Sequence, residues 1–95
     1  MDIDTNEQLI AFCQEALRIP SYSGQEQGVA ELMKRKMEEY GFDEVIIDCF
    51  GSVLGTINGK RPGKTVLMDG HIDTVGVLDA PQWEHDPFGG EIADG

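Results

Sequence analysis

The final part of the chain, residues 70–95, limits the possible folds more than any other stretch. It is rich in glycine, proline and aspartate, and it shows neither a helical nor an alternating apolar period. A compact domain rarely closes on an unstructured segment of this length. We therefore expect the segment to be either functional or the beginning of an unfinished structural unit.

Two amphipathic helices are predicted ahead of this segment. The first runs from Asn6 to about Arg18, follows a capping box that starts at Thr5, and ends before Pro20. Its apolar stripe consists of Leu9, Phe12, Cys13, Ala16 and Leu17.

The second predicted helix runs from Gln25 to Tyr40. A second capping box, Ser23 with Glu26, precedes it, and Gly41 stands where a left-handed residue commonly ends a helix. The apolar stripe consists of Val29, Leu32, Met33, Met37 and Tyr40, and the opposite face is charged, with some i,i+4 pairs expected.

Three β-prone runs separated by glycines follow the helices: Glu44–Asp48, Val53–Ile57 and Thr65–Asp69. The predicted fold class is α/β, with two amino-terminal helices followed by strands of a mixed sheet. Helices on one side of a three-stranded sheet leave its other face uncovered. Residues 1–95 are therefore predicted to form an incomplete part of a larger domain, and the uncovered face to allow self-association.

The charge balance excludes some partners. Seven Lys and Arg residues against 18 Asp and Glu residues give a net charge of −11, which disfavours nucleic acid and anionic membrane surfaces as partners. The apolar runs are far shorter than the roughly 20 residues of a membrane span. Residues 1–4 have no apolar stretch typical of a secretory signal. Cys13 and Cys49 form no CxxC motif, which predicts a reducing cytoplasm and two buried thiols.

A glycine-rich turn from Asn58 to Lys64 resembles a phosphate-binding loop, because Gly59, Gly63, Lys64 and Thr65 approximate a Walker A motif. The spacer is one residue short, and a strand is expected where the motif requires a helix N-terminus. We therefore favour an exposed basic hairpin turn over a phosphate site.

The pair His71 and Asp73 is the strongest candidate for chemistry. In an extended backbone both side chains leave on one face, together with Asp69. A neutral imidazole beside a carboxylate suits a metal ligand and the group that orients it. The spacing is equally compatible with a hydrogen-bonded structural pair.

The surrounding sequence is similar to one family. Residues 67–75 read Leu-Met-Asp-Gly-His-Ile-Asp-Thr-Val, and residues 83–95 contain Trp, Asp-Pro-Phe and Asp-Gly at characteristic spacings. Residues 19–26, with Ile-Pro-Ser and Ser-Gly, and residues 41–53 fit as well. Together they resemble the amino-terminal part of the co-catalytic zinc peptidase and deacylase family. This family includes acetylornithine deacetylase, succinyl-diaminopimelate desuccinylase, carboxypeptidase G and the aminoacylases.

Within that family, the chain is most similar to the putative peptidases linked to selenium metabolism. The similarity lies in residues 41–43, 53–55 and 68–76. Ser52 departs from the pattern, because the family commonly has asparagine at this position.

The resemblance implies an α/β/α catalytic domain with two zinc ions, where cobalt or manganese are also compatible. It implies that His71 is a metal ligand and that Asp73 is the active-site carboxylate supporting the metal centre. In such enzymes the metals activate a water that attacks an amide carbonyl, with a glutamate as general base. The remaining ligands and the glutamate lie beyond the segment matching Gly95. The implied substrates are N-acyl amino acids or small peptides, and the chain by itself is expected to be inactive.

Other polar and aromatic residues are given structural interpretations. His85 is expected to be exposed, Ser23 to cap a helix, and Cys13 and Cys49 to lack a nucleophilic role. Ser21 lies in the same turn as Ser23, without a nucleophile elbow. A further set, Trp83, Pro87 and Phe88, could line a substrate cleft, although anchoring the long loop to the sheet is the favoured interpretation.

A different class of function remains open. The chain could be a non-enzymatic acidic α/β module that associates with itself or binds a protein partner through its uncovered sheet face. A phosphate-binding domain is a third possibility, which rests on the glycine-rich turn alone.

Overall fold

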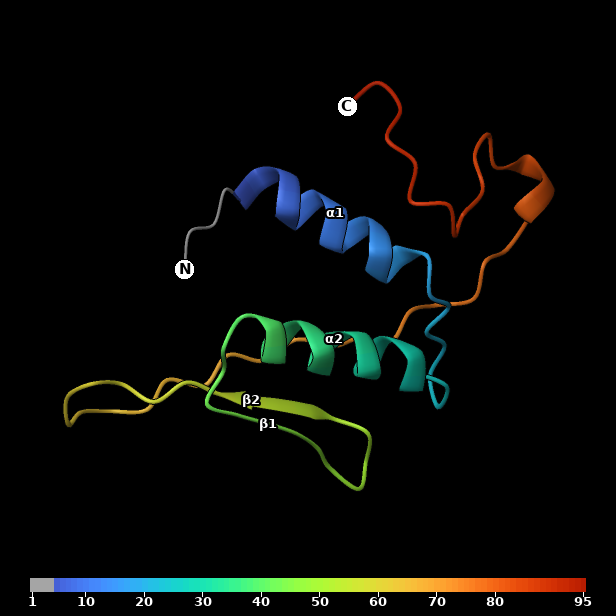
Figure 1. The fold of residues 1–95 in the computed structure, drawn as a ribbon. Coiled ribbons are helices and arrows are strands. Elements are labelled where there is room, and N and C mark those ends of the chain that lie inside the picture. Colours follow the sequence, from blue (N-terminus) through green and yellow to red (C-terminus); the bar gives the residue numbers. More distant parts are fainter. Residues whose placement is uncertain (1–4) are drawn as a thin grey trace.

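A computed structural model describes residues 5–95, so the prediction for residues 1–4 lies outside the described residues. The chain folds into two helices followed by a two-stranded hairpin and a long irregular segment (Figure 1). Helix α1 spans Thr5–Leu17, helix α2 spans Gln27–Glu39, and strands β1 and β2 span Glu44–Ile47 and Val53–Thr56. One 3-10 turn, η1, follows at Ala80–Gln82. The predicted α/β class is confirmed.

The carboxyl end of α2 follows the sequence prediction. Gly41 has a φ of +78°, and its N–H donates to the carbonyl of Glu38 at 3.1 Å, while the N–H of Phe42 donates to Met37 at 3.1 Å. These two bonds satisfy carbonyls that the helix leaves free, in the Schellman arrangement. The turn directs the chain into β1.

The core is small and belongs to α2. Among residues 5–95, the buried apolar residues are Val29, Ala30 and Leu32, all on α2. Strand β1 pairs antiparallel with β2 in a register that sets Ile47 opposite Val53. Figure 1 shows α2 lying over this hairpin and α1 on the side of α2 away from it. Within residues 5–95, Ile46 of β1 and Leu54 of β2 are exposed.

The prediction of a third strand at Thr65–Asp69 is wrong. Residues 65–69 carry no strand assignment, and the side chains of Val66, Leu67 and Met68 are 82%, 88% and 90% exposed. A β-strand needs a neighbouring edge for its backbone hydrogen bonds, and this segment lies on an arm beyond the hairpin (Figure 1). No helix follows Lys64 before η1, which supports rejection of the phosphate-loop interpretation.

The molecule is more extended than a complete domain of its length. Its radius of gyration is 15.9 Å, whereas a compact chain of this size has about 12 Å. None of the helices within residues 5–95 has the length and apolar content needed to cross a lipid bilayer.

Both cysteines contradict their predicted burial, because Cys13 and Cys49 are exposed free thiols. Cys13 lies on the apolar stripe of α1, and no residue of α1 is buried. The stripe has the expected period, but no second apolar surface covers it within the described part of the chain. Cys49 lies in the turn between β1 and β2, beyond the last paired residue.

Candidate metal-ligating site

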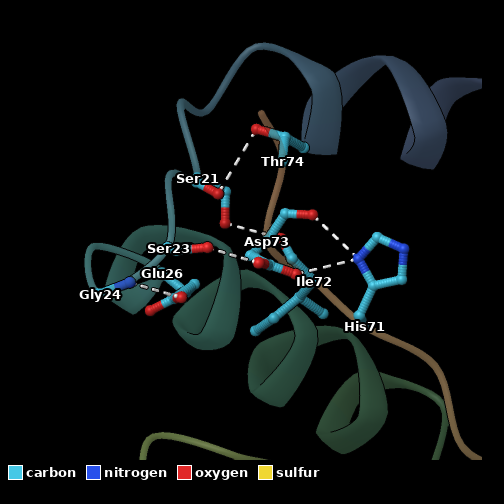
Figure 2. A network of polar contacts seen from close by, with 8 residues as sticks. All are labelled: Ser21, Ser23, Gly24, Glu26, His71, Ile72, Asp73 and Thr74. Atoms are coloured by element: carbon cyan, nitrogen blue, oxygen red, sulfur yellow. Dashed lines mark hydrogen bonds and ion pairs between the residues drawn. The ribbon is translucent and has the colours of Figure 1, made fainter. Parts of the chain in front are cut away.

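The segment that carries His71 and Asp73 is fixed by the turn that precedes α2. Ser21 is 1% exposed, and its hydroxyl donates to the carbonyl of Ile72 at 2.7 Å. The N–H of Thr74 donates back to the carbonyl of Ser21 at 2.7 Å. An isolated parallel bridge between Tyr22 and Thr74 results, and it sets residues 71–74 alongside the turn (Figure 2).

The predicted pair of His71 and Asp73 does meet on one face of the segment. Nδ1 of His71 lies 2.9 Å from the carbonyl oxygen of Asp73 and 3.0 Å from its carboxylate oxygen Oδ1. A carbonyl oxygen only accepts, and so does an ionised carboxylate. The proton of a neutral His71 ring therefore lies on Nδ1, which leaves the lone pair on Nε2.

The free nitrogen of His71 is directed outward. Figure 2 shows Nε2 on the side of the ring away from Asp73, and the side chain is 86% exposed. Nothing within residues 5–95 forms a hydrogen bond to Nε2. In metal-ligating histidines, the second ring nitrogen commonly donates to a carboxylate or carbonyl in the same way.

Ser23 does not cap α2, which corrects the sequence prediction. Its hydroxyl donates to Oδ2 of Asp73 at 2.6 Å, and the residue at the helix start is Glu26, which makes no side-chain capping bond. Glu26 instead accepts from the N–H of Gly24 at 2.7 Å, which closes the turn. Ser23 lies three residues before Glu26, the residue that immediately precedes the helix, so its oxygen is not at the capping position.

The electrostatics of Asp73 follow from these contacts. The hydrogen bond from Ser23, followed by the hydrogen bond from His71, holds the pKa of Asp73 below the usual aspartate range. Both donors favour the ionised carboxylate. Asp73 is therefore charged at neutral pH and accepts from both neighbours.

An open groove lies beside this pair, between the start of α2 and the hairpin. Its volume is about 530 Å³, and its lining includes Glu26, Asp69, His71 and Asp73. Asp69 thus shares the groove, as its parity with His71 suggested, but its side chain makes no hydrogen bond within residues 5–95. In that same range no group of three His, Cys, Asp or Glu side chains is arranged to hold a metal ion.

The remaining candidates have structural contacts. His85 is exposed, as predicted, and its Nδ1 lies 3.0 Å from a carboxylate oxygen of Glu91. The ring of Phe88 packs edge-on against Tyr22, with centroids 6.4 Å apart, and Nε1 of Trp83 donates to the carbonyl of Leu78 at 3.3 Å. The Phe88 contact links the long segment to the turn before α2 and not to the sheet, and the Trp83 bond lies within the segment itself. Pro87 lies with Trp83 and Phe88 along an apolar cavity of about 340 Å³.

Sequence reasoning missed the contribution of Ser21 and Ser23. They are two residues apart in the turn, as are Ile72 and Thr74 in the bridge partner and His71 and Asp73 in the pair. Equal spacing in two extended segments was a usable signal for pairing. This spacing did not show which residues of the two segments pair, because it does not fix how the long intervening chain brings them together.

Known proteins resemble the chain over most of its length. It is 42% identical over 91 residues to the uncharacterized protein YgeY of Escherichia coli, which covers 96% of this chain. It is 38% identical over 88 residues to a succinyl-diaminopimelate desuccinylase of Cereibacter sphaeroides, covering 90% of this chain. Similarity to a desuccinylase over most of the chain agrees with the resemblance to the peptidase and deacylase family. A putative [LysW]-lysine/[LysW]-ornithine hydrolase of Pyrococcus abyssi is 40% identical over 75 residues.

The chain is short beside those relatives. It spans 22% of the length of YgeY and 23% of the desuccinylase. No model of a protein family matches the sequence, and no solved structure matches the chain.

Proposed function

We propose that this chain contributes one metal ligand, His71, and one supporting carboxylate, Asp73, to an enzyme that hydrolyses amide bonds of N-acyl amino acids or small peptides. One observation carries the proposal: two acceptors of Asp73 converge on Nδ1 of His71 and leave Nε2 outward. The same segment lies in a chain 38% identical to a succinyl-diaminopimelate desuccinylase. The combination favours a ligand over a structural histidine, because an exposed ring with one nitrogen bonded stabilises little of the fold.

The donor chemistry fits a divalent metal ion. An outward imidazole nitrogen suits zinc, and it is compatible with cobalt and manganese as well. When bound in such a centre, the metal polarises a carbonyl and lowers the pKa of a coordinated water. Asp73 keeps the His71 ring oriented.

The chain alone is proposed to be inactive. A catalytic zinc site takes about three protein ligands, and the described residues present one outward imidazole with neighbouring carboxylates that are not grouped around it. We propose that the remaining ligands and the general base belong to the rest of the larger hydrolase domain. Two free thiols, Cys13 and Cys49, favour a reducing cytoplasm as its compartment.

Calorimetric titration with zinc chloride tests the assignment. We expect weak binding to the wild-type chain, loss of binding in His71→Ala, and unchanged binding in His85→Ala. The matched control removes the other histidine, whose Nδ1 is paired with Glu91. Because the His71 side chain is 86% exposed, its removal leaves the fold intact, which circular dichroism would verify. Equal binding by wild type and His71→Ala would contradict the proposal.

Self-association is a second candidate function, favoured by one observation. Val66, Leu67 and Met68 are consecutive and more than four-fifths exposed, which is unusual for apolar side chains on an extended segment. A second copy of the chain would bury them. Light scattering should then show dimers that weaken in Leu67→Lys, whereas a monomer at high concentration would count against this function.

A further inference from the structure

Each oxygen of the Asp73 carboxylate has one side-chain partner. Oδ2 accepts from the Ser23 hydroxyl at 2.6 Å, and Oδ1 lies 3.0 Å from Nδ1 of His71. The terminal torsion of an aspartate is broad, so a carboxylate held at one oxygen alone still rotates. Contact at both oxygens fixes its plane.

The Ser23 hydroxyl is itself held in place by the turn around it. The N–H of Gln25 donates to the carbonyl of Tyr22 at 2.8 Å, and the N–H of Gly24 donates to Glu26 at 2.7 Å. Gly24 has a φ of +84°, a conformation that other residues rarely adopt. Two positions earlier, buried Ser21 bonds the backbone of Ile72. The turn is therefore rigid and in register with the segment that carries Asp73.

We propose that Ser23 is a positioning residue, which holds the Asp73 carboxylate against Nδ1 of His71 and so keeps the outward nitrogen of that ring unprotonated. Ser23 has one proton to donate, and its hydroxyl makes its hydrogen bond to Oδ2 of Asp73 (Figure 2). With Oδ2 occupied, Oδ1 and the Asp73 carbonyl both face Nδ1. Ser23 thus acts on a metal ligand through a second side chain and touches neither metal nor substrate.

The role of Ser23 rests on the proposed function, in which His71 binds a metal. Its effect on His71 through Asp73 is testable without metal. Nitrogen-15 NMR of the metal-free chain, at a pH where the His71 ring is neutral, reports which ring nitrogen carries the proton. We expect the Nδ1-protonated form to dominate in the wild type. In Ser23→Ala we expect a shift toward the Nε2-protonated form, and in Ser23→Thr, which keeps the hydroxyl, recovery of the wild-type ratio.

Ser52→Ala is the matched control. Ser52 is exposed, and its hydroxyl makes no hydrogen bond in the part of the chain that the structure describes, so the tautomer ratio should stay at the wild-type value. A wild-type ratio in Ser23→Ala would overturn the inference. So would a shift in Ser23→Ala that Ser23→Thr fails to reverse, because a structural role of the side chain would then explain it.

Zinc titration separates this inference from the proposed function. If both hold, Ser23→Ala binds zinc about 10-fold more weakly, and Ser23→Thr does not. If His71→Ala abolishes binding while Ser23→Ala leaves both the tautomer and the affinity unchanged, the proposed function stands and the inference fails. If Ser23→Ala shifts the tautomer while His71→Ala binds zinc as the wild type does, the positioning contact stands and the metal-ligand proposal fails.

Discussion

Helices α1 and α2 each have 13 residues and an apolar stripe of helical period, yet they end in different environments. Helix α2 buries Val29, Ala30 and Leu32, whereas α1 buries nothing. Leu9 and Leu17 of α1 are 58% and 57% exposed. An apolar stripe therefore forms a helix face, but burial depends on whether a second apolar surface reaches it.

Polar contacts link α1 and the residue that follows it to the rest of the chain. Gln14 and Arg18 donate to the carbonyls of Gly90 and Gly89 at 2.7 Å and 2.9 Å. Glu15 forms ion pairs with two basic residues of α2 at 3.4 Å and 3.6 Å, where solvent screens them. Contacts of this kind orient α1 without supplying a core.

Truncation of one leucine in each helix tests this difference most strongly. We expect Leu32→Ala, which opens a cavity in the core, to lower the free energy of unfolding by about 2–5 kcal/mol. We expect Leu9→Ala to change it by less than about 0.5 kcal/mol. Urea unfolding followed by circular dichroism measures both. Comparable losses in the two variants would mean that α1 is buried in solution, by self-association or otherwise.

The contact between α2 and the hairpin is tested by Gly55→Ala. A Cβ at this position would lie 2.6 Å from both Sδ of Met37 and a ring carbon of Phe42. We expect a loss of about 1–3 kcal/mol from overpacking. Gly63→Ala is the control, because a Cβ there meets nothing within 4 Å. Equal thermal midpoints for the two variants would argue against close packing of α2 on β2.

The polar attachment of α1 is tested by Gln14→Ala. Loss of the bond to Gly90 should lower stability by about 0.5–1.5 kcal/mol and loosen the chain locally. Nitrogen-15 relaxation should show lower order parameters at Gly89 and Gly90. Gln8→Ala on the same helix serves as the control, since its side chain is exposed. Unchanged order in Gln14→Ala would show that the segment is held by other contacts.

The smallest expected effect is a change in the pKa of Asp73 when its contact with the turn before α2 is removed. Because the pKa of Asp73 is lowered in the folded chain, its contribution to stability is present above the ordinary aspartate pKa. That contribution is lost as the pH falls through the folded pKa. Ser23→Ala removes the largest cause of the shift, so the pKa of Asp73 should rise toward its ordinary value. Carboxyl carbon-13 chemical shifts measured between about pH 2 and 6, which brackets the ordinary aspartate pKa, report the pKa of Asp73. An equal Asp73 pKa in the wild type and in Ser23→Ala would contradict the Ser23 contact.

Local signals predicted several elements correctly. The end of α2 at Gly41 depends on the conformational freedom of one residue, and the bonds that follow it involve near neighbours in sequence. The pairing of His71 with Asp73 depends on a spacing of two in an extended backbone. Each of these features needs information from only a few adjacent residues.

Features that need a distant partner could not be predicted in the same way. Thr65–Asp69 has strand-forming residues but no paired edge within residues 5–95, and Cys13 has the right helical phase but no covering surface. Ser23 is a residue type that commonly caps helices, but its hydroxyl donates to Asp73, which lies fifty residues later in the sequence. Composition and spacing alone determined the two helices, the first two β-prone runs and the histidine–aspartate pair, because these follow from local geometry. The tertiary structure decided burial, strand pairing and the partner of Ser23, because each depends on which surface or charge arrives from elsewhere in the chain.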